Sequence, residues 1–506
     1  MSTIIHTSPR PSRQTPRAFE QGGLLDGGHG VATMASTMVD ETQFERGAEV
    51  RRAWLIGLAL FCCYCFFFYR GGNWNVEARN AQIVALADDH TLAIDPYSRW
   101  TGDEAYYQGH FYSDKLIGPS LVAVPFYWAS RRLMEAVGVS PRLALMLALR
   151  VANVFTNAAP SALLGALLYL FLAELGVAAA LRVWLAFAYG FGTLALPYST
   201  ALFGHQFGAV CAFGSFLLLW RQREKWSQGR AIAAGALAGL GAISDFTTML
   251  MACGLGLYAI WAALGRSGQR PRAISVIGRA VVFAVFMALP ISLQLSANWS
   301  SFGSPFVFPH IHHVQASFRA RHTAGLLGVH LPQLMPLYQL TLGPWRGLFY
   351  ASPVLLLALP GFFLLGRARG AEAVLCAALW IGLLLISAGY ENWTAGSAYG
   401  PRYQIAVIPF LIFAAAPAAA RWQFTFKVLA IISIAFTMIV TAHSPFVPEG
   451  LQTPLADALA KFSIGELLHG NLGLAIGLPG VSSLLPLAAV EAAFLYALSG
   501  ISPREQ

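Results

Sequence analysis

The side chains that could do chemistry stand in short clusters, each beside an apolar block of the sequence. They are Glu77; Tyr112, Asp114 and Lys115; and Glu391, Arg402 and Tyr403. A carboxylate placed near a substrate hydroxyl can accept its proton. A Lys ammonium or an Arg guanidinium can hold a phosphate. The clusters therefore indicate a site that binds an anion and moves a proton at the edge of an apolar region.

Glu77 is the first candidate base. Residues 76–88 have helical spacing with one apolar stripe, which predicts a helix lying along a membrane surface. Glu77 follows the first apolar block by a few residues, so its carboxylate is expected at the interface. The alternative is a solvated carboxylate paired with Arg79 or Arg70.

Two cations are candidate phosphate ligands. Lys115 heads the second apolar block, where its stem can stay in apolar surroundings while the ammonium meets an anion. Arg402 follows Gly400 and Pro401, which would fix the turn that directs its guanidinium. Either side chain is equally consistent with an interface anchor, and that alternative stays open.

The remaining polar residues give weaker signals. His205 opens an apolar block, and Asp245 lies inside an apolar stretch, where an ionisable group is usually paired or functional. His310, His312 and His313 lack the spacing of a known metal motif, so no metal ligand is assigned. No Asp-x-Asp occurs in the first polar loop.

Composition shows what must position these residues. Of 506 residues, 56% are hydrophobic and 11% are charged, against roughly a quarter charged in soluble domains. The apolar residues form blocks of about 17–22 residues, the length of a membrane-spanning helix. We therefore expect an all-α, polytopic transmembrane bundle of about 13 spans, with short interfacial helices in its outer loops.

The charge pattern sets the predicted topology. The predicted spans are 53–69, 116–134, 142–159, 160–175, 180–197, 203–220, 231–247, 248–265, 275–295, 347–366, 371–388, 403–420 and 424–442, with a further one near 477–498. Splitting 142–175 at Pro160 leaves the basic links on one side, which the positive-inside rule assigns to the cytoplasm. The polar loops 70–115, 296–346 and 389–402 then share the outer side.

The predicted organisation has three parts. Residues 1–45 are expected to form a disordered cytoplasmic tail, 46–442 the transmembrane bundle, and 443–506 an outer segment with the last span. Topology accounts for the net charge of +9, so the expected partner is a lipid bilayer and not nucleic acid. The six cysteines all lie in apolar blocks and are expected to pack there without disulfides or metal.

The order of these motifs resembles the GT-C glycosyltransferases, closest to the bacterial branch with the lipid A aminoarabinose transferase. The matching residues are Glu77-Ala78-Arg79, Tyr106 to Lys115, Gly400 to Tyr403 with Pro409, and the segments 298–306 and 346–361. Two departures are Leu116-Ile117, where the family usually has Pro-Pro or Ala-Pro, and Glu77, where many members have Asp.

The resemblance implies transfer of a sugar, with inversion, from a polyprenyl phosphate to a lipid, glycan or protein acceptor. It would take place on the periplasmic side of a bacterial inner membrane. Glu77 would be the general base, with Asp95, Asp103 and Glu104 as alternatives; Lys115 and Arg402 would bind the carrier phosphate, and Asp114 would orient one of them. Further substrate contacts are expected from Arg79, Tyr112, His205, Glu391 and Tyr403. Whether the protein binds a divalent cation, Mg²⁺ or Mn²⁺, is left open, because several GT-C members use one.

The main alternative is a transporter or flippase for a lipid-linked or envelope substrate. Transporters favour an internal repeat between halves and helices broken at mid-membrane. No repeat relates 53–265 to 275–442, and the polar residues are concentrated in unequal outer loops. The sequence therefore favours an enzyme with a site built from loops over a helical scaffold.

Overall fold

The computed structural model describes the backbone of residues 27–265, 272–325 and 327–501, and side chains from residue 46 onward within the same gaps. Residues 1–49 and 50–506 form two compact units, and the site lies in the second. Helix α1 (Gly27–Phe66) begins inside the segment predicted to be a disordered tail, so that segment is helical from residue 27 on. Its first part, 1–26, lies outside the described residues.

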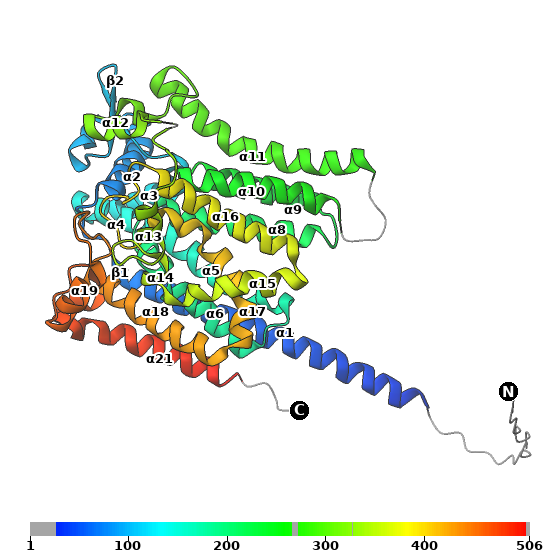
Figure 1. The fold of residues 1–506 in the computed structure, drawn as a ribbon. Helices are drawn as coiled ribbons and strands as arrows, with labels where there is room; N and C mark the ends of the chain where they lie inside the picture. The colour runs from blue at the N-terminus through cyan, green and yellow to red at the C-terminus, as the bar shows by residue number, and fades with distance from the viewer. Residues whose placement is uncertain (1–26, 266–271, 326, 502–506) are drawn as a thin grey trace, which may run out of the picture. The chain divides into compact units, whose positions relative to one another are not determined.

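The described chain is almost entirely helical, which confirms the predicted all-α polytopic class (Figure 1). By length and composition, seven helical runs within it could cross a membrane: Pro141–Leu175, α10 (Phe246–Ala263), α11 (Ala273–Phe302), α16 (Gly370–Gly389), Arg402–Arg421, α18 (Gln423–His443) and Gly480–Ser499. The chain is thus a multi-pass membrane protein.

Several runs consist of consecutive elements. Pro141–Leu175 comprises α4 (Pro141–Asn153), the π-helix η3 (Val154–Ala158), α5 (Ala159–Leu172) and η4 (Ala173–Leu175). Arg402–Arg421 comprises η7 (Arg402–Val407) and α17 (Ile408–Arg421), and Gly480–Ser499 comprises η8 (Gly480–Leu484) and α21 (Leu485–Ser499). The other long or apolar helices are α3 (Gly118–Ala136), α6 (Ala179–Gly192), α8 (Gly204–Gln222), α9 (Gln228–Ala242), and η6 (Pro353–Leu357) with α15 (Ala358–Ala368).

Short elements fill the loops. They are β1 (Phe67–Phe68), α2 (Trp74–Val84), η1 (Ala85–Asp89), η2 (Asp95–Trp100), β2 (Glu104–Tyr107), β3 (His110–Ser113), α7 (Ala195–Ser199), η5 (Pro309–His312), α12 (Ala316–Thr323), α13 (Leu334–Thr341), α14 (Leu348–Ala351), α19 (Pro454–Ser463), β4 (Gly470–Asn471) and α20 (Leu472–Ala475). Strands β2 and β3 form an antiparallel hairpin, and β1 pairs with β4. The prediction of an interfacial helix over 76–88 matches α2 and η1.

The predicted break at Pro160 is wrong. The chain runs as one helix from Pro141 to Leu175, and Pro160 lies in the first turn of α5. The preceding turn is the π-helix η3, and a widened turn accommodates a residue that lacks an N–H and crowds the turn before it. The predicted spans 180–197 and 347–366 correspond to the shorter apolar helices Ala179–Gly192 and Pro353–Ala368.

One end of the bundle gathers basic links, as predicted, and we call it the basic end. Arg221 lies 3.1 Å from Glu174, and Arg223 lies 2.5 Å from Glu372. Arg369 stacks over Trp220 at 4.8 Å. These contacts join the ends of η4, α8 and α15 to the start of α16 and confirm that these basic links share one side.

The link between α3 and α4 departs from that prediction. Arg131, assigned with Arg132 and Arg142 to the basic side, instead forms an ion pair with Asp88 in the first polar loop. Tyr127 donates a hydrogen bond of 2.8 Å to the same carboxylate. Arg131 is therefore neutralised by a carboxylate that comes 43 positions earlier in the chain, and it is not a free positive charge of the α3–α4 link.

Candidate functional site

A cavity of about 780 Å³ lies at the end of the bundle opposite the basic end, which we call the cavity end. All of the polar loops predicted to share the outer side contribute to its wall, with residues such as Asn73, Phe308 and Asn392. Phe246 and Ile386, from α10 and α16, supply apolar wall. The grouping of the loops is therefore confirmed, and the cavity joins a polar chamber to an apolar helix surface.

A Lys–carboxylate cluster lies on one side of the cavity. The Lys115 ammonium is 2.7 Å from the Asp103 carboxylate and 2.9 Å from that of Asp114. Asp114 is completely buried, whereas Asp103 keeps 18% of its side-chain surface exposed. Burial lowers the pKa of Lys115, but the two carboxylates outweigh it and raise the pKa above its ordinary value. The ammonium is therefore charged at neutral pH.

The β2–β3 hairpin creates this cluster. Glu104 pairs with Ser113 in the register of the hairpin, so Asp103 and Asp114 flank its open end as neighbours. The Asp114 N–H donates to the Asp103 carbonyl at 3.3 Å. The tight turn is formed by Gln108 and Gly109 with φ of 50° and 94°, a conformation that glycine adopts readily. A local hairpin therefore brings together two carboxylates that are eleven positions apart in the sequence.

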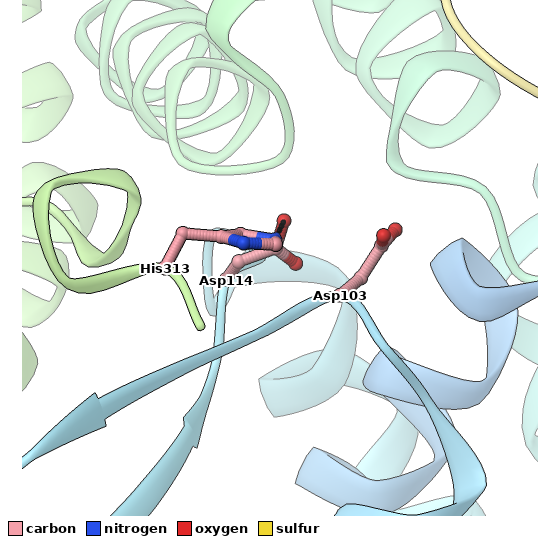
Figure 2. A group of neighbouring side chains, drawn as sticks. All are labelled: Asp103, Asp114 and His313. Carbon is pink, nitrogen blue, oxygen red and sulfur yellow. Dashed lines mark ion pairs between the residues drawn. The ribbon is translucent and has the colours of Figure 1, made fainter. Parts of the chain in front are cut away.

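His313 completes a group that resembles a metal site. Ligand atoms of Asp103, Asp114 and His313 lie within 4.8 Å of one another, and Figure 2 shows the side chains reaching the same space. However, His313 Nδ1 accepts the Gln315 N–H at 3.1 Å, which leaves the proton of the neutral ring on Nε2, the atom 3.9 Å from Asp114. With Lys115 already between the carboxylates, the arrangement fits a protein cation better than a metal ion.

Arg79 is buried at the cavity wall without an acidic partner. It comes from α2, whose N-cap Asn73 accepts the Val76 N–H. Its guanidinium donates to Asn75 Oδ1 at 3.2 Å and to the Ser244 carbonyl at 3.4 Å, and in the described part of the chain no carboxylate lies within ion-pair distance. Burial lowers its pKa to about 10, so the group remains cationic.

Arg402 is the second such guanidinium. It is buried at the start of η7, between the rings of Phe203 and Tyr403 at 6.0 and 5.7 Å. Among the described residues, no carboxylate forms an ion pair with it. Buried charges are normally paired or bind a ligand. Arg79 and Arg402 therefore place two buried cationic groups in the wall of the cavity.

Arg346 holds the loop that carries Arg402. Its fully buried guanidinium donates to the carbonyls of Gly396, at 2.7 Å, and Ala398. The loop then turns at Gly400, whose φ is +64°. Sequence reasoning assigned no role to Arg346; its place in a Gly-Pro-Trp-Arg-Gly segment between apolar blocks was the available signal.

His205 and Asp245 form a buried pair on the same wall, 2.9 Å apart. Asp245 also caps α10 by accepting the Thr247 N–H at 3.0 Å. Burial alone would raise the pKa of Asp245, but His205, the Thr247 N–H and Arg79 together hold it well below its usual range. The carboxylate is therefore ionised, and His205 and the Thr247 N–H hold it in place.

A wall from the long loop 303–333 covers the cavity. His322 Nδ1 is 2.9 Å from the Phe318 carbonyl, so it carries the proton, and Nε2 accepts a hydrogen bond from the Tyr390 hydroxyl. His310 stacks on His322 with a centroid distance of 4.7 Å. Because the Tyr390 hydroxyl donates its hydrogen bond to His322, it can only accept a hydrogen bond from a group in the cavity. Sequence reasoning missed this pair.

The structure brings most of the predicted site residues to one cavity. Those that line it are Arg79, Asp114, Lys115, His205, Arg402 and Tyr403, and of the alternative bases Asp103. Those outside its lining are Glu77, Tyr112, Glu391, Asp95 and Glu104.

The position of Glu77 follows from helical geometry. Residues two apart on a helix point to nearly opposite sides, so the turn that directs Arg79 into the cavity directs Glu77 away. Its carboxylate accepts hydrogen bonds from the Tyr69 hydroxyl at 2.9 Å and from Asn80 Nδ2 at 3.0 Å.

Local contacts also explain why other predicted site residues lie outside the cavity. Tyr112 packs against Phe302, with ring centroids 5.2 Å apart. Glu391 is about half exposed, and its nearest basic neighbour is His330 at 3.8 Å. Asp95 accepts the Phe111 N–H at 2.7 Å, away from the cavity.

Comparison with known proteins gives little beyond the fold. No family model matches the chain, and no curated protein matches it in sequence. Two solved structures are similar: an archaeal oligosaccharyltransferase, AglB from Archaeoglobus fulgidus, in complex with an inhibitory peptide and a dolichol-phosphate, and the A. fulgidus oligosaccharyltransferase tethered to an acceptor peptide. Identity is 12% in both, with TM-scores of 0.43 and 0.41.

The matches cover 89% and 90% of this chain but 56% of each oligosaccharyltransferase chain. The chain therefore spans little more than half the length of the structures it resembles. With 12% identity and TM-scores below 0.5, these matches do not assign the activity of those enzymes to this chain.

Proposed function

We propose that this protein is a GT-C membrane glycosyltransferase that moves a sugar from a polyprenyl-phosphate donor to an acceptor hydroxyl or amide. The carrying observation is that two buried guanidinium groups, Arg79 and Arg402, line the same cavity as the Lys115–Asp103–Asp114 cluster, and that no carboxylate of the described residues lies within ion-pair distance of either. A phosphate supplies the anion that both arginines lack, and the apolar wall suits a lipid tail.

The proposed reaction has one bond-making and one bond-breaking event at the anomeric carbon. The acceptor oxygen or nitrogen attacks this carbon, and the bond to the phosphate oxygen breaks with its electron pair remaining on the lipid phosphate. Arg79 and Arg402 stabilise the charge that develops on that leaving group. Attack from the face opposite the phosphate inverts the anomeric configuration.

Asp103 is the base we propose in place of Glu77. It is the more exposed carboxylate of the cluster, and its ion pair with Lys115 holds it in place. It takes the acceptor proton as the new bond forms. Asp114, completely buried, positions Lys115 and does not itself meet substrate.

The location follows from the same arrangement. With the basic end in the cytoplasm, the cavity end faces the periplasm of a bacterial inner membrane. The acceptor would then be an envelope lipid, glycan or protein.

The test uses the purified full chain in lipid nanodiscs with radiolabelled polyprenyl-phosphate sugars and an envelope extract. Transfer should be lost in Asp103→Asn and retained in Glu77→Gln and in the surface control Glu391→Gln. Donor binding should weaken at least tenfold in Arg402→Gln and stay unchanged in Asp103→Asn. Movement of intact donor across the bilayer without its consumption would instead establish a flippase.

A further inference from the structure

Trp74, the first residue of α2, lines the cavity and has no part in the reaction proposed above. Its ring packs on Gly102: a Cβ built there would stand 2.9 Å from Cε3, 2.9 Å from Cζ3 and 3.0 Å from Cη2. Three neighbouring ring carbons can be almost equally distant from one point only if that point lies over the face of the ring. Trp74 is nevertheless 51% exposed, so the opposite face is left for the cavity.

Trp74 is also tied to the proposed base. The Thr101 hydroxyl donates to the Trp74 carbonyl at 2.8 Å and accepts the Asp103 N–H at 2.9 Å. Asp103 directly follows Gly102, the residue beneath the ring, and lines the same cavity. A ligand stacked on the open face of Trp74 therefore lies beside the carboxylate that takes the acceptor proton.

Two buried amide side chains border the same cavity with hydrogen-bonding groups to spare. Asn392 is 6% exposed, and its side chain makes no hydrogen bond to any described residue. Asn75 is 7% exposed; its Oδ1 accepts a hydrogen bond from Arg79 at 3.2 Å, and its Nδ2 has no partner among the described residues. Buried amides are normally hydrogen-bonded, so these two groups suit a ligand with neutral donors and acceptors.

The wall around Trp74 is polar but uncharged. The lining residues from 72–75 and 389–400 are Gly72, Asn73, Trp74, Asn75, Tyr390, Asn392, Gly396 and Ser397. Asn73 Nδ2 joins the two segments by donating to the Ser397 carbonyl at 3.2 Å. The two buried guanidinium groups and the apolar wall of α10 and α16 account for the phosphate and lipid tail of the donor, which leaves this neutral wall for the acceptor.

We propose that a sugar ring of the acceptor stacks on Trp74, so that the acceptor is a glycan; this rests on the proposed function. A pyranose has an apolar C–H face, which suits an aromatic ring, and a rim of hydroxyls, which suits the amides of Asn75 and Asn392. One hydroxyl oxygen forms the bond to the anomeric carbon and loses its proton to Asp103, while the lipid phosphate leaves with the electron pair of the broken bond.

Binding gives a test that needs no turnover. The probe is the tritiated glycan fraction of the cell envelope, freed of protein by protease and of acyl chains by saponification, added without donor to the full chain in nanodiscs. Trp74→Leu should weaken its binding at least tenfold, and Trp74→Tyr, which keeps a ring, less than threefold. Trp128→Leu is the matched control, because Trp128 is 50% exposed and lies outside the lining of the cavity.

Binding of polyprenyl phosphate should be unchanged in Trp74→Leu, which shows that the cavity is intact. If it is lost, Asn392→Ala is the second variant, with the same expectation of weaker glycan binding and normal donor binding. A wild-type protein that binds no glycan would overturn the proposal. So would equal binding by Trp74→Leu, the result expected if Trp74 only anchors the chain in lipid.

The acceptor class is tested by treating the envelope extract before labelled donor is added. Mild periodate, which cleaves vicinal diols of sugars and is then quenched, should abolish transfer, whereas protease digestion and saponification should leave it. Transfer that survives periodate, or is lost on protease digestion, would refute a glycan acceptor while upholding the glycosyltransferase. Absence of transfer from every extract would instead refute the proposed function, and the glycan-binding result would stand apart from it.

Discussion

Gly204 and Arg79 lie so close that no side chain fits between them. A Cβ built on Gly204 would stand 2.5 Å from Arg79 Nη2 and 2.1 Å from the Ser244 carbonyl oxygen. The start of α8 therefore approaches the guanidinium through a position that only glycine can occupy. The anion site depends on this close approach as much as on the arginine itself.

Gly204→Ala should displace Arg79 and loosen the contact between α8 and the α9–α10 link. Overpacking of this kind costs about 1–3 kcal/mol. We expect a lower Tm and weaker binding of a polyprenyl phosphate, measured by differential scanning fluorimetry and by titration. Gly256→Ala is the matched control, since nothing lies within 4 Å of its Cβ position on α10; an equal loss in both variants would contradict the explanation.

Arg346→Gln should weaken donor binding although Arg346 does not line the cavity. The carbonyls of Gly396 and Ala398 would lose their charged donor. Hydrogen bonds to charged groups contribute about 1.5–3 kcal/mol each. We expect the KM for donor to rise more than kcat falls, because Arg402 shifts without being removed. The control Arg367→Gln, in the last turn of helix α15 and exposed, should leave both unchanged.

Glu104 makes stability depend on pH. Burial, and then the charge of Asp114, raise its pKa to about 7. Between about pH 4.5 and 7 the unfolded chain loses this proton while the folded chain keeps it, so the contribution of Glu104 to stability falls as pH rises. Glu104→Gln should therefore increase Tm more at pH 8 than at pH 5. A Tm gain that is independent of pH would contradict this assignment.

Tyr390→Phe should loosen the loop that covers the cavity. The substitution removes the hydrogen bond to His322 while keeping the aromatic ring. Amide exchange over 316–333 should then accelerate several-fold, measured by mass spectrometry. Tyr338→Phe, an exposed tyrosine of α13, is the control. Unchanged exchange in Tyr390→Phe would show that the backbone contacts at Tyr390 hold the loop without the hydroxyl.

The sequence predicted well those features that depend on local patterns. The lengths of the apolar blocks predicted the polytopic class. Asp114 and Lys115 lie in a cluster of charged side chains, as their spacing predicted, because a short hairpin of neighbouring residues assembles it. The grouping of the polar loops followed from counting crossings.

Features that depend on long-range packing were not predictable. Whether Glu77 or Arg79 faces the cavity is decided by the rotation of α2 against its neighbours, which no spacing within the helix reveals. The partner of Arg131, Asp88, stands too far away in the chain for a charge rule to take into account.

The pairing of β1 with β4 has a consequence for biosynthesis. Phe67 and Phe68, directly after the first helix, bond to Asn471 and Gly470, which leave the ribosome about 400 residues later, and contacts between such distant segments form late. The end of α1 must therefore wait, with its strand unpaired, until nearly the whole chain has been inserted. A ribosome that stalls before residue 470 would leave a protein with every cavity residue present but with the strand after its first helix unpaired.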